Sequence, residues 1–383
     1  MSLSIWEKES FYAPSDVLIV GGGLLGLWTA RELKIKRPAQ KVTLIDKNAT
    51  PSGASLRNAG FACFGSPSEL VHDAQLMGVS EMWRVVEMRY KGIEKILQVL
   101  GEDRVGFENI GGYEGFERSE EGRWLGWKED LRWLNKGLQD ITGHAEVFKI
   151  ADDKLAVNGL QGFAHLVENS LEGGLHSGKL VPALMANVRE LGVRIISGME
   201  YKSFDATADT FKVEVAGKED QRFTFTTRQL VFASNAWLSQ QFPLLKIKPA
   251  RGQVILSPPI PKMALSGTFH FEGGYYYFRN LGNRLLLGGA RNKDFKNEET
   301  LDAGNTDVVT NALYNFITAH IPQAAAFPLE SYEKWSGTMA MHPSKKPVLQ
   351  QVENGVWAAM CCNGMGVALS PVFAEQVAAA VIN

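Results

Sequence analysis

A short apolar segment that ends in a glycine-rich turn most limits how this chain can fold. Residues 17–20 are all aliphatic, and the turn Gly21-Gly22-Gly23-Leu24-Leu25-Gly26 follows directly. Such an uninterrupted apolar run is typical of a strand that is buried on both faces of a parallel sheet. Residues 24–35 have helical character, and residues 41–46 read as a second buried strand. The order strand, helix, strand predicts a β-α-β unit.

The turn matches the G-x-G-x-x-G pattern that holds the pyrophosphate of a dinucleotide. Gly21 permits the tight turn, Gly23 lets the backbone approach a pyrophosphate, and Gly26 lets the helix pack closely on the strand. The pyrophosphate then lies at the helix N-terminus, where free N–H groups and the helix dipole attract an anion. Asp46 stands 20 residues after Gly26, at the end of the next strand, where a carboxylate can accept hydrogen bonds from a ribose diol. The pattern predicts a dinucleotide, either FAD or NAD, and a glycine turn that binds nothing is the structural alternative.

Length and composition narrow the class of protein. At 383 residues the chain exceeds the usual size of one domain, so we expect two. A formal net charge of −2 argues against nucleic acid or an anionic membrane as the main partner. Three cysteines without metal-ligand spacing predict neither a disulfide framework nor a metal site. The N-terminus lacks the features of a signal peptide and no apolar stretch is long enough to span a bilayer, so we expect a cytoplasmic protein.

Three further segments decide between the two cofactors. They are residues 53–60 (GASLRNAG), residues 230–237 (LVFASNAW) and residues 362–371 (CNGMGVALSP). In this order, together with the glycine turn and the chain length, they resemble the D-amino acid oxidase family of FAD-dependent oxidoreductases over essentially the whole chain. The motifs are most similar to γ-glutamylputrescine oxidase-like and glycine or sarcosine oxidase-like members.

The resemblance implies an α/β protein, α+β overall, with two domains. A Rossmann-like FAD-binding domain with a parallel central sheet is expected to comprise residues 1–80, 150–240 and 340–383. A substrate-binding domain with a largely antiparallel sheet and flanking helices is expected to comprise residues 81–149 and 241–339.

The resemblance also implies non-covalent FAD, because the segment through which sarcosine oxidases attach the flavin resembles residues 335–349, which contain no cysteine. The Ser55 hydroxyl and the Arg57 guanidinium are expected beside the pyrophosphate, although Arg57 can equally form a surface salt bridge. The loop 363–366 and the helix after it are expected at the pyrimidine end of the flavin, where a helix dipole stabilises negative charge on reduced flavin. The expected cofactor-binding residues are Gly21, Gly23, Leu24, Leu25, Gly26, Asp46, Lys47, Ser55, Arg57, Asn58, Ala59, Gly60, Ala233, Asn235, Trp237, Gly364, Met365, Gly366, Val367 and Ala368.

Residues 271–279 carry a candidate substrate-binding face. In a strand, Tyr275, Tyr277 and Arg279 point to one side and suit a polar or carboxylate-bearing substrate. A half-buried sheet with an amphipathic surface is the structural alternative. Arg251, in a segment that resembles the family's PxRGQ strand, and Arg291 are further candidates, and each can equally be structural.

The clearest departure from the family lies at Met339. D-amino acid dehydrogenases and glycine oxidases carry GLRP in a similar place, and that arginine clamps the α-carboxylate of the substrate. A thioether cannot replace a bidentate clamp, so simple α-amino acids are in doubt unless Arg279, Arg251 or Arg291 takes over. An amine, or an N-substituted amino compound, is favoured instead. His342 lies three residues on and either approaches the same pocket or packs at the surface.

We therefore predict an FAD-dependent oxidoreductase, oxidase or dehydrogenase, that transfers a hydride from a carbon bearing nitrogen to flavin N5. The substrate is expected to be a small amine or amino-acid compound, with oxygen or another carrier as electron acceptor. Two alternatives stay open. A 2-hydroxy acid oxidoreductase would need a general base such as His342 near the flavin, and a non-catalytic flavin-binding protein would have a plugged pocket. The candidate catalytic residues are Tyr277, Arg279 and His342.

Overall fold

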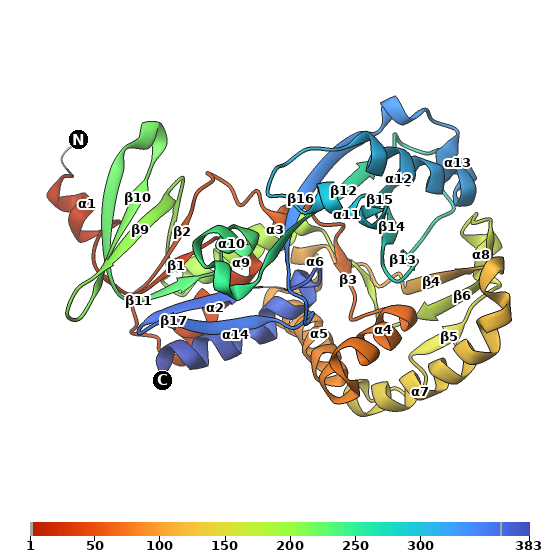
Figure 1. Ribbon diagram of the computed structural model, residues 1–383, viewed down its shortest axis with the longest axis horizontal. Helices are drawn as coiled ribbons and strands as arrows, with labels where there is room; N and C mark the ends of the chain where they lie inside the picture. The colour runs from red at the N-terminus through yellow and green to blue at the C-terminus, as the bar shows by residue number, and fades with distance from the viewer. Residues whose placement is uncertain (1–2, 361) are drawn as a thin grey trace.

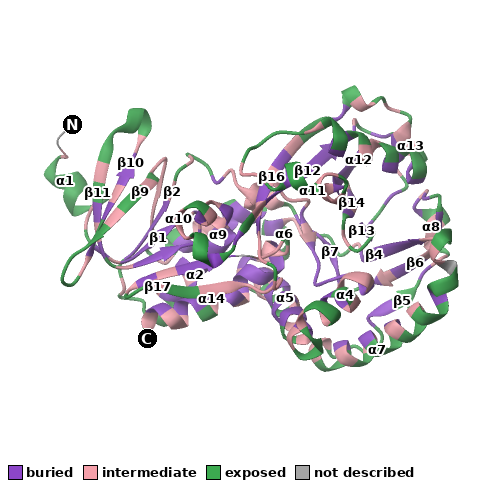
Figure 2. Cartoon of the chain, in the orientation of Figure 1, coloured by how far each residue is buried: buried purple, intermediate pink, exposed green. Residues whose placement is uncertain are grey.

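A computed structural model of the chain describes residues 3–360 and 362–383. The described chain forms two large sheets that lie side by side, with helices packed around and between them (Figure 1). Their strands and the cores beneath the helices are buried, while the outer faces of the peripheral helices and hairpins are exposed (Figure 2). This mixed α/β architecture with one largely parallel and one largely antiparallel sheet confirms the predicted fold class.

The first sheet contains the glycine-turn strand at its centre. The order is β17-β18-β11-β1-β2-β8, with β10 and β9 extending from β11. β1 pairs in parallel with β2 and with β11, and β2 and β11 pair in parallel with β8 and β18. The strands are β1 (Ser15–Val20), β2 (Val42–Asp46), β8 (Arg194–Ser197), β9 (Glu200–Ala206), β10 (Phe211–Ala216), β11 (Arg222–Phe232), β17 (Val348–Glu353) and β18 (Val356–Met360).

Long helices cover the first sheet and share one apolar core. α14 (Gly366–Ile382) packs between α2 (Leu24–Lys36) and α5 (Val79–Leu100), and α9 (Ser177–Glu190) packs on α2. The crossing of α5 and α14 is very close, since a Cβ on Gly92 would lie 1.8 Å from the carbonyl oxygen of Ala368. α4 (Pro67–Met77) and α7 (Trp124–Thr142) extend this helical layer beneath the second sheet (Figure 1).

The second sheet has the order β16-β12-β15-β14-β13-β4-β6-β5. All its pairs are antiparallel except β13 with β4. α12 (Asp307–His320) covers one face and encloses a second, aromatic-rich core. The strands are β4 (Gly112–Glu117), β5 (Phe148–Ile150), β6 (Phe163–Asn169), β12 (Lys248–Leu256), β13 (Thr268–Phe271), β14 (Tyr276–Leu281), β15 (Arg284–Gly289) and β16 (Glu333–Met341).

Short elements connect the two sheets. Among them α3 (Ala54–Arg57) and the pair β3 (Phe61–Ala62) with β7 (Gly173–Gly174) lie at the junction. The remaining helices are α1 (Ile5–Glu9), α6 (Glu102–Val105), α8 (Lys154–Val157), α10 (Leu238–Gln241), α11 (Phe295–Glu298) and α13 (Pro322–Ala325), with 3-10 turns at Arg118–Arg123, Lys218–Asp220, Asn235–Trp237, Pro243–Leu245, Arg291–Lys293 and Leu329–Ser331.

The structure differs from the sequence-based expectation at a few elements. The helical segment 68–101 is divided into α4 and α5, because Gly78 adopts φ +85° and interrupts the helix. The glycine-rich loop 50–66 contains α3 and β3. β6 joins the second sheet, although residues 150–240 were assigned to the FAD-binding domain, and α5 packs on α14 of the first sheet.

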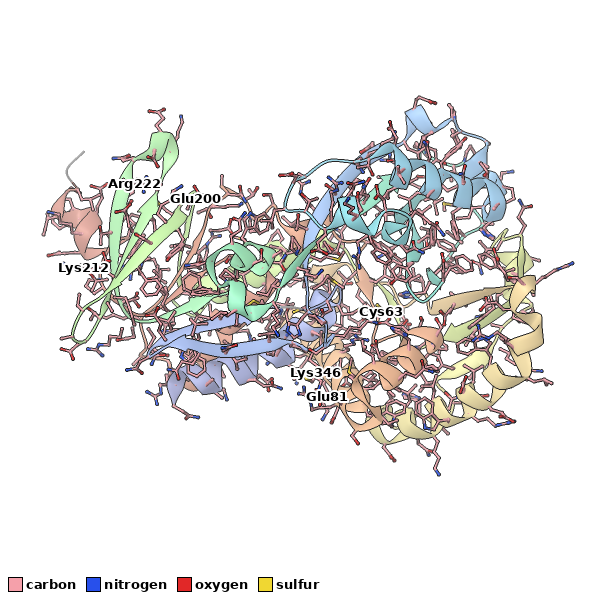
Figure 3. All side chains as sticks on the ribbon, viewed as in Figure 1. Cys63, Glu81, Glu200, Lys212, Arg222 and Lys346 are labelled. Atoms are coloured by element: carbon pink, nitrogen blue, oxygen red, sulfur yellow. The ribbon has the colours of Figure 1, made fainter. Side chains whose placement is uncertain are left out.

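Charged side chains lie on the surface of the peripheral strands and loops. Exposed charged side chains lie on β9, on β10 and at the start of β11, among them Glu200, Lys212 and Arg222 (Figure 3). The loop after β16 is held to α5 by an ion pair between Lys346 and Glu81, with 3.8 Å between nitrogen and oxygen (Figure 3). Within the described part of the chain, no helix combines the length and the apolar character that crossing a membrane requires.

Candidate active site

A large cavity of about 1130 Å³ runs along the junction of the two sheets. It exceeds the ~300–1,000 Å³ that is typical for one small ligand, so it has room for a dinucleotide and a substrate. Its lining comes from the ends of β1 and β2, the loop 51–59, the start of α14 and the facing strands of the second sheet. Every predicted cofactor-binding residue except Gly26 and Gly60 lines it.

The glycine turn requires glycine at two positions for different reasons. Gly21 has φ +114°, and a Cβ there would lie 2.6 Å from the carbonyl oxygen of Ala233 on the neighbouring strand end. Gly26 does not line the cavity, but a Cβ there would lie 1.9 Å from the carbonyl oxygen of Gly21. Any side chain at Gly26 would push α2 off β1. The turn therefore places the N-terminus of α2 directly at the cavity wall.

Asp46 and Lys47 form the cavity wall beside this turn. The two carboxylate oxygens of Asp46 accept the backbone N–H groups of Gly22 and Asn48, at 2.8 and 2.9 Å. A carboxylate oxygen can accept more than one hydrogen bond, so this oriented group keeps acceptor capacity toward the cavity. The Lys47 ammonium lies 4.0 Å from the ring centroid of Trp237, which also lines the cavity.

The loop from Ser52 to Gly60 is held in shape by its own side chains. Ser55 Oγ accepts the N–H of Leu24, at 2.9 Å, and so joins the loop to the first turn of α2. Asn58 donates to the carbonyls of Ala54 and Ser55 and accepts the N–H of Gly60. Asn58 therefore acts within the loop rather than being free for a ligand.

Arg57 bridges the loop to the second sheet. Its Nε donates to the carbonyl of Ser52 at 2.8 Å, and its Nη1 donates to the carbonyl of Ser336 at 2.9 Å. It forms no ion pair with a carboxylate of the described residues and it lines the cavity. The surface salt bridge that was the alternative role for Arg57 is absent from the described contacts. The positive charge of Arg57 is therefore available to bind an anion.

The start of α14 reaches the cavity from the other side. Asn363, at φ +48°, accepts the N–H of His342 through Oδ1, and the helix begins at Gly366. Asn235, at φ +58°, donates to the carbonyl of Thr338 at 2.7 Å. These contacts bring two helix N-termini, those of α2 and α14, to one cavity, and both favour negative charge on a ligand.

Residues 16–380 match the model of the family described as FAD dependent oxidoreductase, DAO. The chain belongs to this family. The resemblance noted from the sequence and the assignment of FAD as cofactor are thereby confirmed.

Individual relatives are distant. Glycine oxidase of Pseudomonas aeruginosa is 24% identical over 371 residues, covering 93% of this chain and 91% of that protein. The bifunctional protein ThiO/ThiG of Synechocystis sp. is 26% identical over 250 residues, and the match covers 63% of this chain but only 33% of that protein. The crystal structure of L-proline dehydrogenase from P. horikoshii superposes with a TM-score of 0.72 at 19% identity, covering 95% of this chain and 92% of that one. This last likeness shows the fold.

The residues of this FAD-dependent oxidoreductase fit its cofactor. The turn at Gly21 and the two helix N-termini provide backbone donors for phosphate and for the flavin edge. Asp46 is oriented for a ribose, and the cavity is long enough to pass from β1 to the strands of the second sheet. When bound there, FAD supplies the hydride acceptor, N5, that the protein itself lacks.

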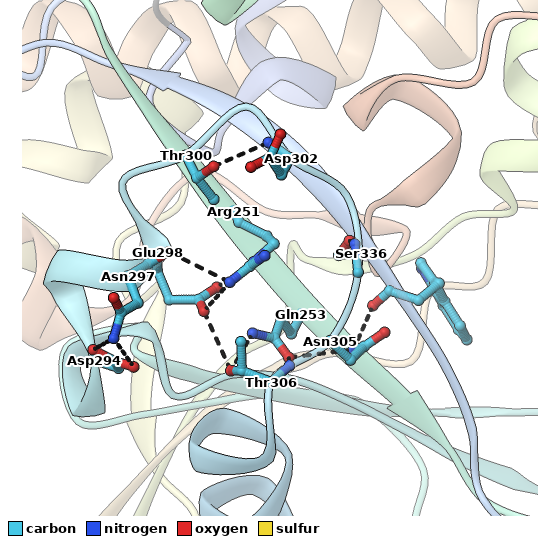
Figure 4. Close-up of polar contacts among 12 residues, drawn as sticks. Arg251, Gln253, Asp294, Asn297, Glu298, Thr300, Asp302, Asn305, Thr306 and Ser336 are labelled. Carbon is cyan, nitrogen blue, oxygen red and sulfur yellow. Dashed lines mark hydrogen bonds and ion pairs between the residues drawn. The ribbon is translucent and has the colours of Figure 1, made fainter.

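Two of the predicted arginines lie elsewhere than expected. The Arg279 guanidinium is buried and donates to the carbonyls of Gly60 and Leu175, at 2.6 and 3.1 Å, and it pairs with Glu108. Arg251 pairs bidentately with the fully buried Glu298, at 2.9 and 2.7 Å, beside the hydrogen bonds of Gln253 and Thr306 (Figure 4). Neither arginine lines the cavity, so both stabilise the fold instead of facing a substrate.

His342 is also outside the cavity lining. Its Nδ1 lies 2.7 Å from Ser344 Oγ, and its backbone N–H is bound by Asn363. Its ring thus belongs to the turn after β16 and does not face the flavin region as a base.

The remaining predicted substrate residues do meet in the cavity. Tyr275, Tyr277, Arg291 and Met339 line it together, and Met339 lies between Gly252 and Gly364. Burial raises the pKa of Tyr277 to about 12, so the phenol is neutral. Burial lowers the pKa of Arg291, whose guanidinium forms no hydrogen bond or ion pair with any described residue and lies 4.9 Å from the ring centroid of Phe295.

Sequence reasoning missed one polar end of the cavity. It is lined by Glu69 and His72 of α4, His270 of β13, Lys345, and Cys63, which Figure 3 labels. Burial opposes the ionisation of Glu69, but nearby Arg89, His270 and Lys345 lower its pKa overall, so Glu69 is a carboxylate at neutral pH. No sequence motif predicts these residues as a group, because only the tertiary structure brings segments far apart in the chain together here.

Proposed function

We propose that this FAD-dependent oxidoreductase oxidises the C–N bond of an amine or amino-acid compound whose carboxylate binds Arg291. The observation that carries the proposal is which of the candidate arginines lines the cavity without an ion-pair partner. Arg291 alone among Arg251, Arg279 and Arg291 lines the cavity, and its guanidinium forms no ion pair with a described residue. Two similar proteins are named glycine oxidase and L-proline dehydrogenase, and both names refer to amino-acid substrates. These names support a nitrogen-bearing substrate for this chain.

The cofactor seat follows from contacts already in place. The N-terminus of α2 and the Gly21 turn are proposed to bind the pyrophosphate, with the Arg57 guanidinium beside it. Asp46 is proposed to accept the ribose hydroxyls, and the N-terminus of α14 to face the pyrimidine end of the flavin.

The substrate is proposed to span the cavity between two charged groups. Arg291 binds the carboxylate through charge-assisted hydrogen bonds, and the neutral Tyr277 phenol can donate another. Glu69, at the other end, attracts the ammonium group. Phe61 and Met339 contribute apolar surface between them and exclude water from the reacting carbon. A substrate with some distance between nitrogen and carboxylate fits this arrangement better than a simple α-amino acid.

Anaerobic titration of the purified flavoprotein tests this function. The panel contains amines, N-substituted amino acids with a distant carboxylate, D-alanine, and 2-hydroxy acids, and the readout is bleaching of the flavin absorbance. We expect bleaching by the amino compounds with a distant carboxylate and weak or no bleaching by D-alanine. Bleaching by hydroxy acids alone would refute C–N oxidation.

Oxidation of a 2-hydroxy acid is the second candidate, because His270 lines the cavity and burial lowers its pKa, which keeps the imidazole neutral and able to act as a base. The same panel separates the two functions. A role without catalysis is not favoured, since the cavity is open over about 1130 Å³ and is not plugged by side chains.

A further inference from the structure

Three polar side chains stand in one row across the second sheet. His270 of β13 pairs in register with Glu114 of β4 on one side and with Tyr277 of β14 on the other. Residues at the same register on neighbouring strands point to the same face and lie about 5 Å apart. Tyr277 and His270 line the large cavity, whereas Glu114 does not. His270 therefore stands between the cavity and Glu114.

A second, very small void lies behind His270. Its volume is about 10 Å³, and its polar lining comprises Ser66, Glu114, Asn169, Glu172 and His270. Such a volume is about that of one water molecule. A buried water also needs two to four polar partners, and two of the lining residues, His270 and Asn169, carry buried polar atoms that can serve as such partners.

Two of these partners are otherwise unsatisfied. His270 Nε2 and Asn169 Nδ2 are buried and have no hydrogen-bond partner among the described residues. Leaving such a group unpaired costs ~1–3 kcal/mol, so a shared partner in the void is strongly favoured. The His270 ring also makes no hydrogen bond on its other nitrogen within the described chain. The ring is thus 94% buried and unbound, with a 6% exposed fraction, and touches both cavities.

The carboxyl groups of the void differ from ordinary surface acids. Burial raises the pKa of Glu114 to about 7, although Ser68 donates to it through its backbone N–H and its hydroxyl. Burial raises the pKa of Glu172 to about 8, against the N–H groups of Phe64 and Gly65. The ionisable groups that line this end of the large cavity or the void are Glu69 and His72 of α4, Cys63 after β3, Tyr113 and Glu114 of β4, Glu172 before β7, Tyr277 of β14 and Lys345 after β16, and Arg89 of α5 pairs with Glu69.

We propose that His270 passes a proton from the substrate's ammonium group in the large cavity to Glu114 through one water molecule in the small void. The inference rests on the proposed function, because an amine must lose this proton before its C–H bond can deliver a hydride. The nitrogen of the substrate gives up H⁺ to the ring nitrogen on the cavity side. The other ring nitrogen releases H⁺ to the water, and the water gives one to the Glu114 carboxylate. The net change is R–NH₃⁺ plus carboxylate to R–NH₂ plus carboxylic acid, with no change of oxidation state.

The relay predicts a specific pH dependence. Glu114 accepts a proton only as a carboxylate, so flavin reduction by a saturating amine should slow as the pH falls through about 7. In Glu114→Gln and in His270→Asn, this fall in rate at low pH (the acid limb of the pH profile) should disappear. Reduction at pH 8 should also slow by about 100-fold, which is the size of a general-base contribution. The pH dependence of the reduction rate that remains in these variants should follow the pKa of the free amine. His165→Asn is the control, because His165 lies in β6 of the same sheet, is partly buried and stacked on Trp124 at 3.8 Å, and does not line either cavity.

Two measurements on the flavin-loaded protein decide the question. Anaerobic stopped-flow reduction gives the pH profiles of the wild type and the three variants, with flavin content as the check on folding. A high-resolution crystal structure of the wild type shows whether a water lies within hydrogen-bond distance of both His270 Nε2 and Asn169 Nδ2. We expect the water, and the loss of the limb in both relay variants.

The outcomes are distinct. A void without water, or an unchanged acid limb in a folded Glu114→Gln protein, overturns the relay while the proposed function stands. If His270→Asn does not fold, Glu114→Gln and the crystal structure still decide. If no amine reduces the wild-type flavin at any pH, both the proposed function and the relay are refuted.

Discussion

Replacing Arg291 with methionine removes the one cavity-lining charge that we assign to a substrate carboxylate, while it keeps a long, apolar side chain. Arg291 is half-buried and its guanidinium forms no hydrogen bond or ion pair with a described residue, so the replacement breaks no polar side-chain contact and changes only the contact with Phe295. The stability of the protein should therefore change little. A hydrogen bond between charged groups contributes ~1.5–3 kcal/mol.

Because ~1.4 kcal/mol corresponds to a tenfold change in Kd, the loss predicts about 10- to 100-fold weaker binding of a carboxylate-bearing substrate. The assay is the concentration dependence of anaerobic flavin reduction, which separates the apparent Kd from the limiting rate. The matched control is the same amine without its carboxylate, for which Arg291→Met should change the Kd less than twofold. Equal losses for both compounds, or no loss for either, would refute the assignment of Arg291.

Three further predictions concern the fold that supports the site. Gly26→Ala should abolish flavin retention, measured as absorbance of the purified protein, because the new Cβ would lie 1.9 Å from the Gly21 carbonyl oxygen; Gly126→Ala, also in a helix but in open space, should retain it. Glu298→Gln should lower the free energy of unfolding by about 3–5 kcal/mol by leaving the buried Arg251 charge unpaired, whereas Glu333→Gln, from an exposed pair, should cost about 1 kcal/mol at most; similar melting temperatures for the two variants would contradict this. Glu172 holds its proton to a pKa of about 8 in the folded state but not when unfolded, so wild-type stability should fall as the pH rises from about 4.5 to about 8, and Glu172→Gln should make the melting temperature less dependent on pH over that range, with Glu114 still contributing up to about pH 7.

The cofactor seat was largely predictable because its signals are local. The strand at 16–20, the helix at 24–35 and the strand at 41–46 are observed as Ser15–Val20, Leu24–Lys36 and Val42–Asp46. Side-chain periodicity and the glycine spacing act within about 30 residues, where the backbone geometry itself determines which groups meet. The same locality explains why Asp46 could be placed beside the turn.

The substrate side depended on contacts that local patterns do not encode. Alternation along a strand correctly puts Tyr277 and Arg279 on one face, but it cannot say where along that face a cavity ends. The Arg279 guanidinium donates hydrogen bonds to the carbonyls of Gly60 and Leu175, which belong to segments more than 100 residues away in the chain. The loop at Ala290, with φ +55°, turns Arg291 into the cavity instead.

The sequence by itself therefore determined the family, the cofactor and the turn that holds it, since these depend on short-range geometry and on motif order. Only the tertiary structure decided which arginine faces the substrate and that Glu114, His270 and Tyr277 form a row. That row exists because β13 pairs in parallel with β4, 156 residues earlier in the chain (270 − 114), and antiparallel with β14, which follows it. The free energy of such long-range pairing comes from the burial of whole sheet faces, and no window of sequence contains it.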